Sequence, residues 1–269
     1  LIPMRRNKLR RALAGDEPFA LGGLVMLEGR ATAQVMAVGG YDFLMVDVQH
    51  SAFSGSSFGD VVAAVRGTDT AVIARVAPGR ADQIEWVLDQ GADGVMVPLV
   101  NTVEEANAAV AACRYPPVGR RSVGGVANLL LRGPDYVTEA DEDVVCIIQI
   151  EHFEGVENLD AILSVPGIDA VTPGHVDLAR SLGHVADYSS GISYSSMPKV
   201  VQDALASISK TCEARGVPVI PVAGSLTEVQ DAVDNGIRVL FCSGDFHLLT
   251  QAVAANVSQC RALLESTTN

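Results

Sequence analysis

The chain has little positive charge, few aromatic residues and no long apolar run. Its 269 residues hold 19 lysines and arginines against 32 aspartates and glutamates, which gives a formal net charge of −13. An acidic surface repels phosphate groups, so we expect neither nucleic acid nor a membrane as a partner. Residues 5–11 form a local basic cluster, which we expect on the solvated face of a first helix.

Signals for export are also missing. No stretch of about 18 apolar residues occurs, and the N-terminus lacks the charged, apolar and small-residue order of a secretory signal. The five cysteines are odd in number, widely spaced and form no Cys-x-x-Cys pair, which is typical of reduced cytosolic thiols. We therefore expect a cytoplasmic protein without disulfides or a zinc cluster.

Lysine is scarce, and none of the three lysines, Lys8, Lys199 and Lys210, falls at the end of an expected strand. A Schiff-base aldolase needs such a lysine, so imine chemistry is disfavoured. The aromatic fraction is 5 %, which argues against a glycosidase because such sites usually carry sugar-stacking rings.

Short apolar runs alternate along the chain with longer helical patterns. Strands are predicted at 20–26, 43–47, 71–76, 94–98, 144–150, 170–173, 217–222 and 238–242. Helices are predicted at 31–38, 58–66, 82–90, 103–113, 156–163, 198–215, 226–235 and 246–264. Eight such units predict an α/β fold, a single (β/α)₈ TIM-type barrel over residues 4–269, rather than an open doubly wound sheet. The irregular stretches 114–138 and 183–197 are expected to be active-site loops.

Polar residues gather where the predicted strands end, and in a barrel these ends meet at one mouth. Glu151 and Asp177 follow neighbouring strands, and two carboxylates with open positions suit Mg²⁺ or Mn²⁺. Asp177 also precedes a helical pattern and is equally suited to capping it. His50 lies three residues after Asp47, which favours a general base oriented by a carboxylate.

Arg75 lies inside an apolar run, where an unpaired guanidinium is costly. It therefore needs an anionic partner, either a bound substrate or an internal carboxylate.

Five ordered segments carry a family resemblance: YDFLMVDVQH at 41–50, GADGVMVP at 91–98, RYPPVGRRS at 114–122, QIE at 149–151 and GHVDLA at 174–179. With these segments the chain resembles the HpcH/HpaI family of metal-dependent class II 2-oxo acid aldolases. The resemblance implies a barrel that assembles as a homohexamer, a trimer of dimers, with its C-terminal helix exchanged between subunits.

The resemblance also assigns roles to residues. It implies that Glu151 and Asp177 bind a divalent metal, with Mg²⁺ favoured over Mn²⁺ or Co²⁺. It places the 2-oxo acid on Gln149 and on the loop that holds Gly174, His175, Val176 and Asp177. The remaining assignments are Arg75 for the keto oxygen, His50 for the general base and Asp89 for the acid that pairs with His50.

The implied activity is that of a lyase, reversible aldol cleavage of a 4-hydroxy-2-oxo acid into pyruvate, or a similar 2-oxo acid, and an aldehyde through a metal-stabilised enolate. Gln49 and His175 depart from the family pattern, which commonly has Glu and Pro there. These departures motivate an alternative, a citrate-synthase-like enzyme that condenses a thioester enolate such as that of an acyl-CoA with oxaloacetate. A third hypothesis is a barrel that binds a 2-oxo acid or metal without turnover.

Overall fold

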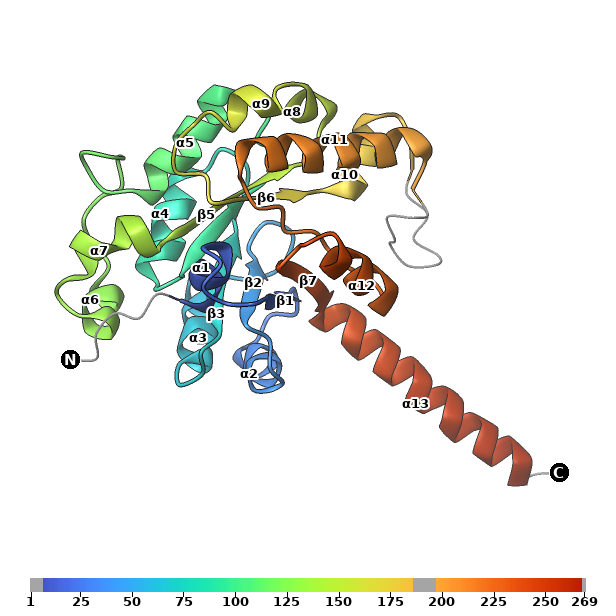
Figure 1. Ribbon diagram of the computed structural model, residues 1–269. Coiled ribbons are helices and arrows are strands. Elements are labelled where there is room, and N and C mark those ends of the chain that lie inside the picture. The colour runs from blue at the N-terminus through green and yellow to red at the C-terminus, as the bar shows by residue number, and fades with distance from the viewer. Residues whose placement is uncertain (1–6, 186–196, 268–269) are drawn as a thin grey trace.

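A parallel sheet of seven strands forms the centre of the computed structural model, which describes residues 7–185 and 197–267 (Figure 1). The strands lie in the order β6-β5-β4-β3-β2-β1-β7. Their bounds are β1 Ala20–Val25, β2 Phe43–Asp47, β3 Ala71–Arg75, β4 Gly94–Val97, β5 Val145–Ile150, β6 Ala170–Pro173 and β7 Val239–Gly244. Every neighbouring pair is parallel, as the alternation of strands and helices predicts.

The strand predicted at 217–222, the seventh of the eight, is only partly formed. Residues 217–223 connect the two edges of the sheet through single bridges, Val219 to Val171 of β6 and Val222 to Phe241 of β7. Pro218 and Pro221 have no N–H to donate, so this segment cannot form a regular ladder, although their carbonyls accept from Val171 and Phe241, each at 2.9 Å. The sheet is thus curled, in an arrangement consistent with a TIM-type barrel.

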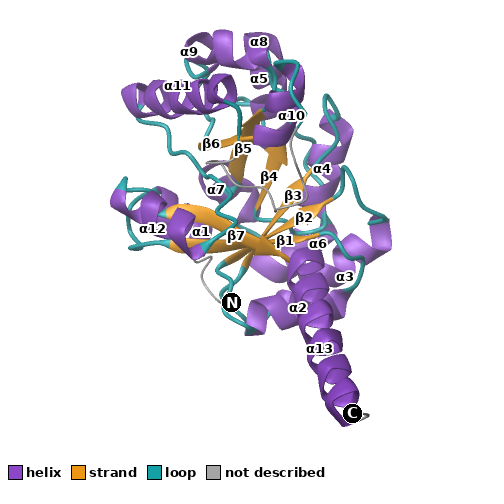
Figure 2. Ribbon diagram, turned by 90° about the vertical axis from the view of Figure 1, so that its right-hand side faces the viewer, coloured by secondary structure: helices purple, strands orange, loops and turns teal. Residues whose placement is uncertain are grey.

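Helices connect the strands and cover the outside of the sheet (Figure 2). Their bounds are α1 Lys8–Leu13, α2 Arg30–Val38, α3 Gly55–Val65, α4 Ala81–Asp89, α5 Val103–Cys113, α6 Val126–Arg132, α7 Tyr136–Asp143, α8 Phe153–Glu157, α9 Leu159–Ile162, α10 His175–Ser181, α11 Lys199–Arg215, α12 Leu226–Asp234 and α13 Asp245–Thr267. Thr102 and Glu105 begin α5 with a capping box, which satisfies N–H groups at that end.

The strands separate two apolar cores because successive side chains point to opposite faces. In β2, Phe43 and Met45 belong to the inner core, whereas Leu44 and Val46 pack against the helices. All five residues of this strand are buried, as expected for a parallel sheet that is covered on both faces. Gly22 leaves room for the rings inside, since a Cβ there would lie 2.3 Å from Phe43.

The solvated basic helix predicted near the N-terminus is wrong for the residues that the structure describes. In α1, Lys8 pairs with Asp42 at 2.6 Å, and Arg10 pairs with Asp169. Arg10 also donates to the carbonyl of Val144 at 2.6 Å, and its side chain is only 14 % exposed. The cluster therefore attaches α1 to the ends of the strands through half-buried ion pairs. Arg5 and Arg6 lie outside the described residues.

The first predicted irregular stretch contains two short helices, α6 and α7. They are seven and eight residues long, and Gly133 and Pro134 between them give the sequence the appearance of a loop. Most of the second stretch, residues 186–196, lies outside the described residues. Among the described helices, none combines the length and apolarity needed to cross a membrane.

Candidate active site

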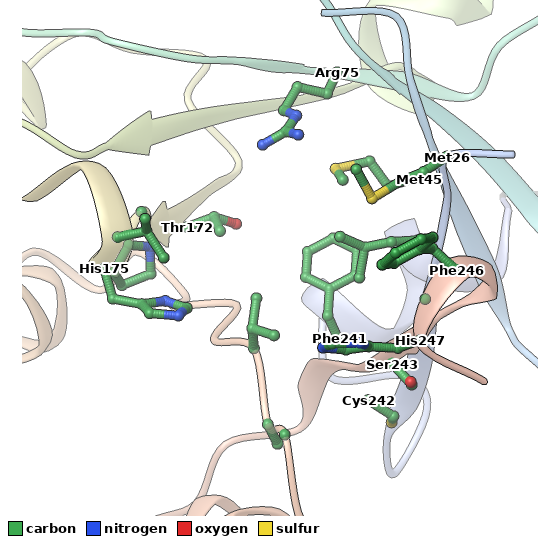
Figure 3. A pocket seen from close by; sticks show the side chains of 18 of the residues that line it. Met26, Met45, Arg75, Thr172, His175, Phe241, Cys242, Ser243, Phe246 and His247 are labelled. Atoms are coloured by element: carbon green, nitrogen blue, oxygen red, sulfur yellow. The ribbon is translucent and has the colours of Figure 1, made fainter. Parts of the chain in front are cut away.

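A cavity of about 530 Å³ opens where the strands end at their carboxyl side (Figure 3). Strand ends and the loops that follow them supply its lining, which includes Met26, Arg75, Gln149 and the turn from Gly174 to Asp177. The family resemblance assigns Arg75, Gln149 and this turn to the 2-oxo acid, and the structure brings them to one cavity.

Glu151 and Asp177 lie close to each other beside this cavity. Glu151 is 4 % exposed, and its carboxylate accepts from the backbone N–H of Leu99 at 3.0 Å and from Nε2 of Gln149 at 2.7 Å. Burial and the negative charge of Asp177 raise the pKa of Glu151 to about 7. Asp177 is exposed, and a cation between the two carboxylates would relieve the repulsion that it exerts on the buried Glu151.

These two carboxylates fit a divalent metal that keeps several open positions. The helix after β6 begins at His175, so Asp177 lies in its first turn and the prediction that it caps the helix is wrong. Among the described residues, no cluster of three or more His, Cys, Asp or Glu side chains surrounds one point. Mg²⁺ commonly binds through one or two carboxylates and fills its other positions with water and substrate oxygens.

Two polar atoms of the cavity lining have unsatisfied hydrogen-bonding capacity. Oε1 of Gln149 and Oγ1 of Thr172 are buried and have no hydrogen-bond partner in the part of the chain that the structure describes. Such atoms are costly unless a ligand or water satisfies them. A small polar ligand that lies between Gln149 and Thr172 would supply the missing partners.

Gly174 provides the close approach between the turn and β5. A Cβ at this position would lie 2.4 Å from both Cβ and Oε2 of Glu151 and 2.7 Å from Nε2 of Gln149. A glycine is therefore required here for the turn to approach both side chains.

Arg75 finds its anionic partner in Asp47, an internal carboxylate. Nε and Nη2 of Arg75 donate to the two oxygens of Asp47 at 3.0 and 2.7 Å. Asp47 is fully buried and also accepts the backbone N–H groups of Gln49 and His50. The expectation that Asp47 orients the His50 imidazole is wrong, because Asp47 binds the backbone of His50 while the His50 side chain is exposed.

Asp89 lies at the end of α4 and pairs with Arg121, whose Nη2 donates to it at 2.9 Å. The Arg121 side chain is fully buried, and its guanidinium lies 4.7 Å from the ring centroid of Tyr115. In the described part of the chain, no ion pair joins Asp89 to His50. The pairing of Asp89 with His50 stays a prediction.

One side of the cavity consists of residues that the sequence does not indicate as site residues. Met26, Phe241, Phe246 and His247 line it. Phe246 and His247 directly follow the last strand, the position at which the other site residues were sought. His175 faces the cavity (Figure 3), and burial lowers its pKa.

Comparison with known proteins shows the family of the chain. A family model described as HpcH/HpaI aldolase/citrate lyase matches residues 24–249. A hydroxypyruvate/pyruvate aldolase of Roseovarius nubinhibens is 33 % identical over 97 % of this chain and 99 % of that protein.

Two solved structures share the fold. An HpcH/HpaI aldolase from Desulfitobacterium hafniense superposes with a TM-score of 0.85 at 25 % identity, over 96 % of this chain and 97 % of the other. The citrate synthase SbnG superposes with a TM-score of 0.84 at 25 % identity, over 96 % and 98 %.

Proposed function

Because the chain belongs to the HpcH/HpaI aldolase/citrate lyase family, we propose that it is a divalent-metal-dependent carbon–carbon lyase. Its reaction is the reversible aldol cleavage of a 4-hydroxy-2-oxo acid into pyruvate, or a similar 2-oxo acid, and an aldehyde. The observation that carries this proposal is the pair formed by the buried carboxylate of Glu151 and the exposed carboxylate of Asp177, which lies at the strand ends beside Gln149 and the guanidinium of Arg75.

Glu151 and Asp177 would hold the metal, with Mg²⁺ as the first candidate and Mn²⁺ or Co²⁺ as alternatives. A bound divalent metal supplies Lewis acidity to the oxygens of the 2-oxo acid. Gln149 and the backbone N–H groups of Val176 and Asp177 bind and orient the acid. The turn at Gly174 and His175 closes this side of the binding site.

Arg75 stabilises the negative charge that develops on the former keto oxygen. Asp47 engages Nε and Nη2 of Arg75, which holds the guanidinium in place and leaves Nη1 for the substrate. His50 removes the proton of the 4-hydroxyl group while the bond between C3 and C4 breaks. The electron pair of that bond forms the enolate, which then takes a proton at C3, and Asp89 assists as the partner of His50.

We also propose that the protein assembles as a homohexamer, a trimer of dimers, in which α13 is exchanged between subunits. The support is the position of α13, which projects away from the sheet beyond its first turns (Figures 1 and 2). Residues 4–269 as a single barrel domain and a cytoplasmic location stay predictions.

The experiment that tests the proposed chemistry is proton–deuterium exchange at the methyl group of pyruvate. We would follow it by NMR with EDTA-treated protein and again after addition of Mg²⁺ or Mn²⁺. Exchange that requires the metal supports enolate formation without knowledge of the aldehyde. Absence of exchange with every metal contradicts the proposal.

The structural likeness to the citrate synthase SbnG keeps the condensing alternative as a second candidate. Its test is release of CoA thiol from acetyl-CoA in the presence of oxaloacetate. Thiol release without methyl exchange would favour that alternative over the aldolase.

A further inference from the structure

One side of the cavity is apolar and takes no part in the chemistry proposed above. Figure 3 shows Met26, Met45, Phe241 and Phe246 gathered on this side, across the open space from Thr172 and His175. We call these four side chains the apolar wall. Met45 and Phe241 are buried at its base, whereas Met26 is half-buried and Phe246 is 56 % exposed. The wall therefore extends from the inner core towards the mouth.

A buried carboxylate fixes the outer part of this wall. Asp245 is 4 % exposed and accepts the backbone N–H groups of Met26 at 3.0 Å, Leu27 at 2.9 Å and Phe246 at 2.7 Å. One side chain thereby joins the segment after β1 to the first turn of α13. Met26 and Phe246, far apart in the sequence, are held on the same side of the cavity before any ligand binds.

The charges around the cavity disfavour a second anionic group. Among the described residues that line it, Arg75 is the only lysine or arginine, and Asp47 already neutralises it. Asp177 and Glu228 also line the cavity. A carboxylate on the distal end of a substrate would be removed from water without a cation to pair with, which is costly.

We infer that the aldehyde partner of this enzyme carries an uncharged apolar group, an alkyl chain or aromatic ring, which packs against the apolar wall. This inference rests on the proposed aldolase function. In the synthetic direction, C3 of the 2-oxo acid loses a proton and forms a bond to the aldehyde carbon. The aldehyde oxygen takes a proton and becomes the 4-hydroxyl, while the apolar substituent stays on Met26 and Phe246.

Two aldehydes of nearly equal shape test this preference. 4-Methylpentanal ends in an isopropyl group, and succinic semialdehyde ends in a carboxylate of similar size. We would measure kcat/KM for each in aldol addition with saturating pyruvate and Mg²⁺. The expected result is a preference of about tenfold or more for 4-methylpentanal, the range in which apolar pockets discriminate. Equal rates, or a preference for succinic semialdehyde, would overturn the inference.

Variants assign the preference to the wall. Phe246→Ala should lower the ratio of the two kcat/KM values about fivefold or more, because it removes the largest side chain at the rim. Phe19→Ala is the matched control, since Phe19 is 57 % exposed and lies outside the cavity. Met26→Lys should shift the ratio towards succinic semialdehyde by adding a cation. An unchanged ratio in both wall variants would overturn the assignment.

A binding measurement separates this inference from the proposed reaction. Saturation-transfer NMR would compare 4-methylpentan-1-ol with 4-hydroxybutanoate, neither of which has an aldehyde group. Stronger transfer to the alcohol, lost in Phe246→Ala, supports the apolar wall even if turnover fails. Methyl exchange of pyruvate without any preference between the ligands leaves the aldolase function standing and overturns the inference. Absence of methyl exchange contradicts the proposed aldolase function. In that case the binding measurement alone decides whether the apolar wall prefers an apolar group.

Discussion

Two acidic residues at the ends of strands, Asp47 of β2 and Glu151 after β5, have opposite surroundings. Asp47 accepts four donors, two from Arg75 and one each from the backbone of Gln49 and His50. Glu151 instead lies beside a second carboxylate, Asp177, and burial together with this negative charge raises the pKa of Glu151. The first arrangement satisfies a buried charge within the protein, whereas the second is satisfied best by a bound cation.

Glu151→Gln should remove the response of the protein to divalent metal. In the wild type, Mg²⁺ at about 100 times its Kd should raise the free energy of unfolding by about 2.7 kcal/mol. The variant retains the shape of the side chain but loses one charged ligand, so we expect this stabilisation and the metal-dependent methyl exchange to disappear. Asp177→Asn should behave in the same way.

Thermal unfolding with and without Mg²⁺ measures this effect. Glu154→Gln is the control, because Glu154 is exposed on α8 and near Glu151 in sequence. A full Mg²⁺ response in Glu151→Gln would remove Glu151 from the metal site.

Asp47→Asn should destabilise the fold by about 3–5 kcal/mol, because it leaves the guanidinium of Arg75 largely buried without a counter-charge. The side chains of Asp47 and Arg75 are 0 % and 16 % exposed. Asp82→Asn breaks a pair of similar geometry with Arg80. The side chains of Arg80 and Asp82 are 57 % and 69 % exposed, so this variant should change stability little. Urea unfolding of both variants checks this, and equal losses would contradict the structural role of Asp47.

Most strands and helices could be predicted because their signals are local. β2 and α5 have the predicted bounds, since a short continuous apolar run marks β2 and a capping box begins α5. The strand predicted at 217–222 shows where local signals fail, because two prolines reduce it to single bridges. The half-buried ion pairs of α1 cannot be predicted for a different reason. The partners of its basic residues, Asp42 and Asp169, are distant in sequence.

Those residues of the candidate site that lie at strand ends can be predicted from the sequence. Arg75, Gln149 and Asp177 reach the cavity because parallel strands present their carboxyl ends at one edge. The apolar wall was not predictable in this way. Asp245 and Met26 are 219 residues apart, and only closure of the sheet between β1 and β7 brings them into contact.

Asp245→Ala should loosen the connection between β1 and α13. The variant loses charge-assisted hydrogen bonds to three backbone N–H groups, each of which contributes about 1.5–3 kcal/mol when its partner remains buried. We expect a loss of at least about 2 kcal/mol in urea unfolding, together with faster amide exchange at Met26 and Leu27. Asp60→Ala, at an exposed position of α3, is the control. Unchanged exchange at Met26 would contradict the proposed link.

The whole molecule consists of the curled sheet with its helices and of α13, which extends away from them (Figure 2). Leu249, Val253, Val257 and Leu264 are all exposed on this helix, by 55, 53, 41 and 66 %. Their spacing of four, four and seven residues places them along one face. An apolar stripe on a projecting helix is unfavourable in water, so we expect another subunit to cover it.

Val253→Asp together with Val257→Asp should therefore dissociate the assembly. Two buried charges in a helix interface have no compensating partner, so light scattering during size-exclusion chromatography should show hexamers for the wild type and smaller species for the double variant. Ser258→Asp places a charge on the same helix outside the stripe and should leave the mass unchanged. The cavity lies at the first turn of α13, and exchange of this helix predicts that dissociation also lowers methyl exchange of pyruvate. A double variant that stays hexameric would show that the stripe is not the interface, and the exchanged helix would have to be abandoned.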